Sequence, residues 1–205
     1  MQFNHYGGEG AQLAADLVNV SAPLTAAELE PVLASHGIVE RSLTAAQARG
    51  TWAWSRRLAP CFGPQDLELR CQRINKLLAD AFSQPHISLH DGHPHLHYSD
   101  ADADTHIRTV TIAGIAYVVC FAGATRLGRC ARRACDRSFV DTSRNGRRTY
   151  CSVRCANNDA VARHREQRRS GNQETGTKRA RATPRARPIR SGVSVDSEDC
   201  PAVAL

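Results

Sequence analysis

Four cysteines in two close pairs are the residues of this sequence best suited to chemistry. Four residues separate Cys130 from Cys135, three separate Cys151 from Cys155, and fifteen lie between the pairs. Zn²⁺ is held well by four thiolates in a tetrahedron, and each close pair can reach such an ion from one local turn. The spacing therefore predicts one structural Zn²⁺ bound by these four side chains. Two disulfides are the alternative, which the basic surroundings disfavour because they stabilise thiolates.

The residues between and after the pairs predict a small finger around this metal. Residues 138–141 and 147–150 have the composition of short strands, and Asn145-Gly146 between them is a strong hairpin signal. A helix is expected from Cys155 to about Arg169. A hairpin and a helix that share one metal predict a treble-clef-like finger.

Charge is unevenly distributed along the chain and points to a polyanionic partner for the finger. Residues 1–125 contain eight Arg or Lys against twelve Asp or Glu, whereas residues 126–169 contain thirteen against four. Cations at this density repel one another unless a counter-charge is present. Guanidinium groups contact phosphates or guanine edges, so double-stranded DNA is the expected partner. The predicted DNA contacts are Arg144, Arg147, Arg148, Arg154, Arg163, Arg165, Arg168 and Arg169.

The first 125 residues predict a mostly helical domain with one hairpin. Apolar spacing predicts helices over about 12–19, 25–36, 44–58, 64–82 and 103–122, and Asp91-Gly92 predicts a hairpin turn. Thr25 and Thr44 begin capping-box patterns, Pro64 suits a first helical turn, and Arg70 falls on the solvent side of its helix. The expected class is α+β, mostly α. The expected order is a domain over 1–125, the finger over 126–169 and a disordered tail over 170–205, which is rich in Arg, Pro, Ser, Gly and Thr.

Membrane and catalytic functions have little support in the sequence. The first residues lack a signal-peptide pattern, and the apolar run over 112–124 is short and interrupted by glycine, so a cytoplasmic, nucleoid-associated protein without a membrane partner is expected. Histidines are dense over 86–97, and those at 93, 95 and 97 could share a metal on one strand face. No catalytic signature accompanies them, so a polar hairpin face is the simpler interpretation, and the chain is not expected to be an enzyme.

Residues 129–169 resemble the CGNR zinc finger of bacterial regulators. The most specific part is the run Phe-Val-Asp-Thr-Ser-Arg-Asn-Gly-Arg-Arg over 139–148. The other matching residues are Cys130, Cys135, Cys151, Ser152, Cys155, Arg163 and Arg165. The family's Cys-Gly-Asn-Arg tetrad is Cys-Ala-Asn-Asn over 155–158 here, and the last cysteine pair encloses three residues where four are commoner.

The N-terminal half is similar to the ABATE domain found before that finger. The similarity rests on Asp-Leu-Val-Asn over 16–19, on the helical order and on the late hairpin. The two resemblances imply a stress-induced transcription regulator with a C-terminal DNA-binding finger. The N-terminal domain would then form a homodimer or sense a small-molecule or protein effector. The alternative is a zinc finger that binds proteins or RNA without specific DNA binding.

Overall fold

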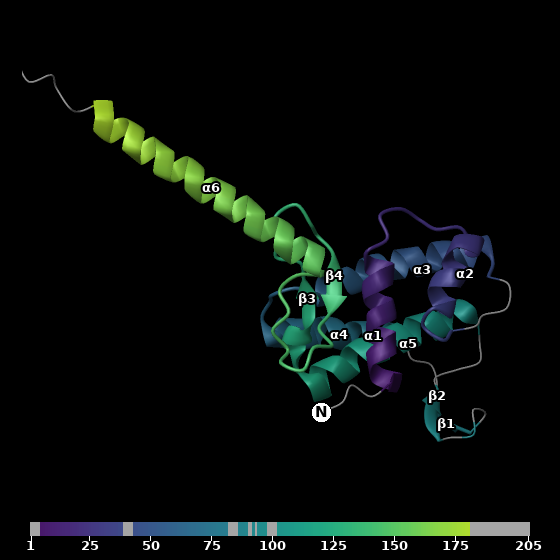
Figure 1. Cartoon of the computed structure of the whole chain (residues 1–205). Coiled ribbons are helices and arrows are strands. Elements are labelled where there is room, and N and C mark those ends of the chain that lie inside the picture. The colour runs from purple at the N-terminus through teal and green to yellow at the C-terminus, as the bar shows by residue number, and fades with distance from the viewer. Residues whose placement is uncertain are drawn as a thin grey trace, which may run out of the picture. The chain divides into compact units, whose positions relative to one another are not determined.

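The computed structural model describes residues 5–38, 43–81, 86–89, 92, 94–97 and 102–180. Its helices are α1 (His5–Val18), α2 (Ala26–Ala34), α3 (Ala45–Leu58), α4 (Leu67–Ala81), α5 (Ala103–Tyr117) and α6 (Val153–Ala180). Its strands are β1 (His86–Ser88), β2 (His95–His97), β3 (Leu127–Arg129) and β4 (Ser138–Val140) (Figure 1). The predicted mostly helical α+β class is confirmed. The described residues up to Ala162 form one compact unit, and those from Arg163 onward form a second.

Both predicted capping boxes are present. The Thr25 hydroxyl accepts a hydrogen bond from the Glu28 N–H, and the Glu28 carboxylate accepts one in return from the Thr25 N–H. Thr44 and Gln47 do the same at the start of α3. After α2 the chain turns at Gly37, whose φ of 74° favours a residue without a Cβ. These caps fix where α2 and α3 begin.

Helix α1 lies at the centre of the first unit and packs closely against α5 (Figure 1). Two glycines allow the close approach: a Cβ on Gly114 of α5 would lie 2.3 Å from the Ala11 nitrogen, and a Cβ on Gly10 would lie 2.3 Å from the Val110 carbonyl oxygen. One side of α1 packs into an apolar cluster with α3, α4 and α5. Its Leu13 and Leu17 belong to a second cluster with α2. The helix is therefore enclosed on two sides.

Helix α5 continues through a π-helical turn (Val118–Gly123) and a 3-10 turn (Ala124–Arg126). The helical segment Ala103–Arg126 is long and apolar enough, by length and composition alone, to cross a membrane. It is longer than the apolar run noted in the sequence. Ile107, Ile112 and Ile115 are fully buried, and α5 contacts α1, α3 and α4. The predicted helix over about 103–122 is therefore confirmed, and its central part is buried.

Two expectations about α4 were wrong. Pro64 precedes the helix, which begins at Leu67 because the Asp66 carboxylate accepts the Leu69 N–H at 3.0 Å and caps the first turn. Arg70, expected on the solvent side, is 3% exposed. Its guanidinium donates to the Gly63 and Ala124 carbonyls, so it ties α4 to the segment that leads into the finger.

The two hairpins differ in how well the sequence predicted them. β1 and β2 pair antiparallel with Ile87 opposite Leu96, as expected, although residues 90, 91, 93 and 98 lie outside the described residues. In the finger, β4 pairs with β3 rather than with residues 147–150. Helix α6 begins at Val153 and continues to Ala180, beyond the expected end near Arg169. Residues 181–205 of the expected tail lie outside the described residues.

Candidate metal centre

The four predicted cysteines converge on one point. Their sulfur atoms all lie within 4.8 Å of one another. The Sγ of Cys151 lies 3.7 Å from that of Cys135 and 3.5 Å from that of Cys155. Tetrahedral coordination at a Zn–S distance of about 2.3 Å places sulfurs roughly 3.8 Å apart, whereas a disulfide needs about 2.05 Å. The donor set fits Zn²⁺, and all four thiols are free, so the disulfide alternative does not hold.

Two local turns position the ligands. Between β3 and β4 the Cys130 N–H donates to the Arg137 carbonyl at 2.9 Å and the Cys135 N–H donates to the Arg132 carbonyl at 2.8 Å, which forms a tight knuckle. The second pair lies at the start of α6, where the Ser152 hydroxyl accepts the Cys155 N–H at 3.2 Å. Cys155 is thereby held in the first turn of the helix, and Cys151 lies just before it.

The thiols differ in how readily they ionise. Burial raises the pKa of Cys151 to about 12, with hydrogen bonds from the neighbouring thiols adding to the shift. A hydrogen bond from the Ser152 side chain lowers the pKa of Cys155 to about 7, with contributions from Cys151 and Arg132. A zinc ion replaces protons on such thiols, so metal binding releases protons and folds the finger together.

The buried Asp141 organises the loop between β4 and the second cysteine pair. Its carboxylate accepts the Ser143 N–H at 2.9 Å and the Arg148 N–H at 2.8 Å. Arg126 donates to the Asp141 and Ser143 carbonyls, and Gly146 turns with a φ of 59°. Burial alone would raise the pKa of Asp141, but the hydrogen bonds from Ser143 and Arg148, together with the Arg126 charge, lower it. This carboxylate-centred loop replaces the predicted strand over 147–150.

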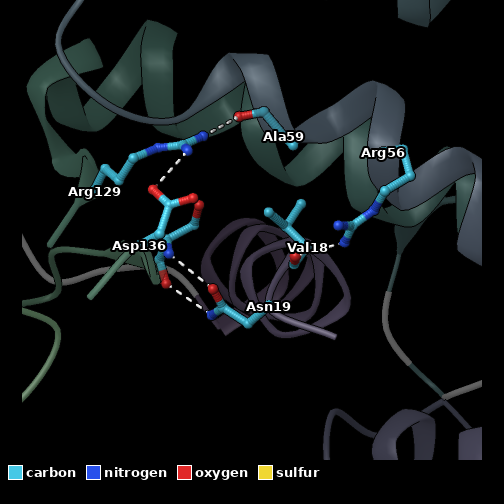
Figure 2. Close-up of polar contacts among 7 residues, drawn as sticks. Val18, Asn19, Arg56, Ala59, Arg129 and Asp136 are labelled. Atoms are coloured by element: carbon cyan, nitrogen blue, oxygen red, sulfur yellow. Dashed lines mark hydrogen bonds and ion pairs between the residues drawn. The ribbon is translucent and has the colours of Figure 1, made fainter. Parts of the chain in front are cut away.

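A set of polar contacts joins the finger to the helical region (Figure 2). The Asn19 side chain, just after α1, accepts the Ser138 N–H at 2.8 Å and donates to the Ser138 carbonyl at 2.9 Å. Arg129 of β3 donates to the Ala59 carbonyl at 3.1 Å and to the Asp136 carboxylate at 2.9 Å. Arg56 of α3 donates to the Val18 carbonyl at 2.6 Å. The end of α1 is thus fixed on one side to α3 and on the other to the finger.

The structure places the predicted DNA-contacting arginines in two groups. Arg144, Arg147, Arg148 and Arg154 are exposed in the first unit. Arg163, Arg165, Arg168 and Arg169 are exposed in the second unit. Within the first group the Arg148 guanidinium is already engaged, because it donates to the Tyr150 and Cys151 carbonyls and lies 4.9 Å from the centre of the Phe139 ring. The Arg148 guanidinium therefore stabilises the loop through these contacts.

Sequence reasoning missed several residues on which the site depends. Asn19, Arg126 and Arg129 hold the finger in place, and Asp141 orders its loop. Asn19 and Asp141 both lie in runs quoted for the family resemblances, but those runs did not show which atoms they bind. Arg126 and Arg129 were counted only as charge, because an arginine that binds carbonyls has the same sequence signature as an exposed one.

The fold and the geometry therefore define a structural zinc site in a four-cysteine finger. The finger is built from a knuckle hairpin and the start of a helix. Residues 126–168 match the family model of the CGNR zinc finger, which confirms the sequence resemblance for this part of the chain. No curated protein matches the chain closely enough to count as a relative. The four cysteines hold one structural Zn²⁺. The resemblance of the N-terminal half to the ABATE domain stays a prediction.

Proposed function

We propose that this chain is a zinc-dependent DNA-binding transcription regulator, which acts by binding rather than by catalysis. The observation that carries the proposal is a group of exposed arginines in the segment that holds the four zinc ligands. Arg144, Arg147 and Arg154 have no acidic partner among the residues that the structure describes. Unneutralised cations in a segment of net charge +9 bind a polyanion favourably, because contact with phosphates releases counterions.

Helix α6 supplies a second group of arginines. Arg165, Arg168 and Arg169 follow the i, i+3, i+4 spacing that places side chains on one side of a helix. Arg163 lies two residues before Arg165 and so points in a different direction. Positioning contacts to phosphate outnumber base contacts in protein–DNA interfaces, so phosphate is the expected target of most of these groups.

The helical region has a regulatory part in this proposal. We expect it to correspond to an ABATE domain that pairs two chains or receives an effector. A single small finger reads few base pairs, so a dimer that presents two fingers to two half-sites would supply useful specificity. The protein would then work in the bacterial cytoplasm, on the nucleoid.

Fluorescence anisotropy with labelled duplexes, titrated with salt, tests the proposal. The zinc-loaded chain should bind duplex DNA, and the logarithm of the affinity should fall with the logarithm of salt concentration by about 0.9 per phosphate contact. Replacing Arg144 and Arg147 by alanine should reduce that slope by about 2, since each lost contact removes about 1.

Arg57→Ala is the matched control, because Arg57 is also an exposed arginine but pairs with Asp80 in the helical region. It should leave the slope unchanged. Absence of duplex binding at about 50 mM salt, where phosphate attraction is strong, contradicts the proposal. Binding of single-stranded RNA or of a protein partner under the same conditions would then favour the interaction-module alternative.

A further inference from the structure

Two adjacent rows of side chains follow the exposed side of α6 over residues 153–161. At the i, i+4 spacing that aligns side chains along a helix, one row is Val153, Asn157 and Val161. The other row is Arg154 and Asn158. All five side chains are exposed, with Val153 at 77% and Val161 at 48%. These five residues, the outer face of α6, are therefore open to a partner.

The opposite side of the same turns packs against the finger. Cys155 is 8% exposed and contributes its sulfur to the metal site. Asp159 is half-buried and accepts a hydrogen bond from the Tyr150 hydroxyl at 2.9 Å. Asp159 is the only acidic residue over 151–162, and it lies roughly 140° around the helix from Arg154. The zinc site thus fixes which side of α6 is turned outward, and that side has a positive charge and no negative one.

Helix stability does not explain the two consecutive asparagines of the outer face. Asparagine is among the weaker helix formers, and both residues lie past the capping position of a helix that begins at Val153. The side chains of Asn157 and Asn158 make no hydrogen bond with the residues that the structure describes. Each amide offers a donor beside an acceptor, which complements the N7 acceptor and N6 donor of adenine in the major groove. Guanine presents two acceptors there, so the same amide cannot pair with both.

The other side chains of the outer face fit the same surface. Val153 and Val161 suit the methyl group of thymine, which small apolar side chains contact in the major groove. Residues 153–161 span about 12 Å along the helix, which corresponds to roughly three to four base pairs at about 3.4 Å each. The segment 126–169 has a net charge of +9, thirteen Arg or Lys less four Asp or Glu, which favours a polyanion over a neutral protein surface.

We infer that the outer face of α6 lies in the major groove of duplex DNA and reads A·T base pairs. Asn157 and Asn158 hydrogen-bond adenine edges, Val153 and Val161 contact thymine methyl groups, and Arg154 contacts the phosphate backbone. The inference rests on the proposed function and adds the class of DNA sequence that the finger selects. Affinity then comes mostly from the arginines, and specificity comes from uncharged side chains.

Three hairpin duplexes of equal length separate major-groove reading from other preferences. One alternates A and T, one alternates G and C, and one alternates inosine and C. Inosine lacks the 2-amino group of guanine, so an I·C pair has the major-groove edge of G·C and a minor groove like that of A·T. In fluorescence anisotropy at one fixed salt concentration, the zinc-loaded full chain should bind the A–T duplex about tenfold more tightly than the G–C duplex, the effect of one good bidentate contact. The I–C duplex should bind as weakly as the G–C duplex.

Two double variants assign the preference to the outer face. Asn157→Ala/Asn158→Ala should lower the affinity for the A–T duplex about tenfold, to that for the G–C duplex. Alanine is a better helix former than asparagine, so the fold should be retained, and metal analysis should still find one zinc ion per chain. Arg144→Ala/Arg147→Ala is the matched control. It should weaken binding to all three duplexes by the same factor, because phosphate contacts carry no sequence information.

An A–T duplex made with uracil in place of thymine tests the two valines. Uracil lacks the methyl group, so the wild type should bind this duplex about fourfold more weakly, the effect of one buried methyl group. Val153→Ala/Val161→Ala should bind the thymine and uracil duplexes alike. Equal binding of the two duplexes by the wild type overturns the role of the valines.

The comparison of duplexes needs only the wild type, so it does not depend on how the variants fold. Equal affinity for all three duplexes overturns the inference and leaves the proposed function standing. An I–C duplex that binds as tightly as the A–T duplex places the preference in the minor groove and also overturns it. An A–T preference that the asparagine double variant retains does the same. Binding to none of the duplexes contradicts the proposed function itself, and the inference fails with it.

Discussion

Asp141 shows how one buried carboxylate orders an arginine-rich loop. It is 1% exposed, and both of its oxygens accept backbone N–H groups from the loop that carries Arg144 and Arg147. In Asp141→Asn, an amide NH₂ group replaces one carboxylate oxygen and so faces a backbone N–H of Ser143 or Arg148, donor against donor. We expect a loss of about 1–3 kcal/mol in the free energy of unfolding, the usual cost of an unsatisfied buried group. Chemical denaturation of the zinc-loaded protein measures it.

Asp136→Asn is the matched control for that measurement. Asp136 is 86% exposed and pairs with Arg129 on the surface. Exposed ion pairs contribute roughly 0–1 kcal/mol, so this change should have a small effect. Equal losses for the two variants would show that the position of Asp141 has no special structural role.

The same carboxylate makes the loop sensitive to acid. Its folded pKa is lowered, so its contribution is fully present above the unfolded value of about 4 and is lost as the pH falls through the folded value. The stability difference between the wild type and Asp141→Asn should therefore be largest near pH 7 and shrink as the pH falls below about 5. Urea midpoints measured at pH 7 and at the lowest pH at which metal analysis still finds one zinc ion per chain test this. A difference that grows as the pH falls contradicts the assignment.

Two buried threonines should respond in opposite ways to loss of their hydroxyl group. The Thr51 hydroxyl lacks a partner among the described residues, so Thr51→Val should raise the free energy of unfolding by about 1 kcal/mol. Thr109 is equally buried and donates to the Ala81 carbonyl at 3.0 Å, so Thr109→Val should lower it by a similar amount. Thermal unfolding of both variants measures the effects. A fall in both would mean that the Thr51 hydroxyl has a partner.

At the level of elements, the packing of α1 on α5 depends on glycine. A Cβ on Gly114 would lie 2.3 Å from a backbone nitrogen of α1, and neither backbone can move without disturbing both apolar clusters. Gly114→Ala should therefore destabilise the protein by about 1–3 kcal/mol or more, the cost of overpacking. A thermal melt followed by circular dichroism measures the loss.

Gly50→Ala in α3 is the control for this packing effect. The nearest neighbour of the added Cβ would be the carboxylate of Asp104, at 3.0 Å, which is a side chain rather than backbone. Alanine also favours a helix by about 1 kcal/mol over glycine, which offsets the crowding. A loss for Gly50→Ala as large as that for Gly114→Ala would contradict the backbone-contact explanation.

The elements that the sequence predicts well are those fixed by near neighbours. The capping boxes at Thr25 and Thr44 each need only a residue three positions on, and the zinc ligands need only two short gaps. The partner of β4 was not predictable in this way. Asn145-Gly146 is a local hairpin signal that pointed to residues 147–150, but these residues form a loop held by the Asp141 carboxylate, and β4 pairs with β3 instead. The contact between Asn19 and Ser138 joins residues 119 positions apart, and no pattern marks such a pair.

At the scale of the first unit, the finger and the helical region share one core. Leu127 of β3 and Val140 of β4 belong to the apolar cluster that contains Trp54 and Ile115. Structural zinc sites contribute most of the folding energy of small fingers, so removing the ion should unfold the finger and take these side chains from the core. The helices should then melt at a lower temperature.

Chelation of the intact chain tests this coupling. We expect one unfolding transition at 222 nm with zinc, and a single transition at a lower temperature after treatment with a zinc chelator. Cys135→Ser should behave like the chelated protein, since it removes one ligand. A helical melt that stays at its original temperature after chelation would show that the two parts fold independently.

The burial of Leu127 and Val140 also determines whether the finger and the helical region can be produced as separate fragments. A fragment starting at Arg126 keeps every zinc ligand, yet it brings into water two side chains whose burial is worth roughly 1.5–3 kcal/mol each. The complementary fragment ending at residue 125 exposes the apolar surface that Leu127 and Val140 cover in the whole chain. It also loses the Ser138 backbone that Asn19 binds. Shuffling this finger onto another protein therefore requires either a new apolar patch to receive it or polar replacements at both positions.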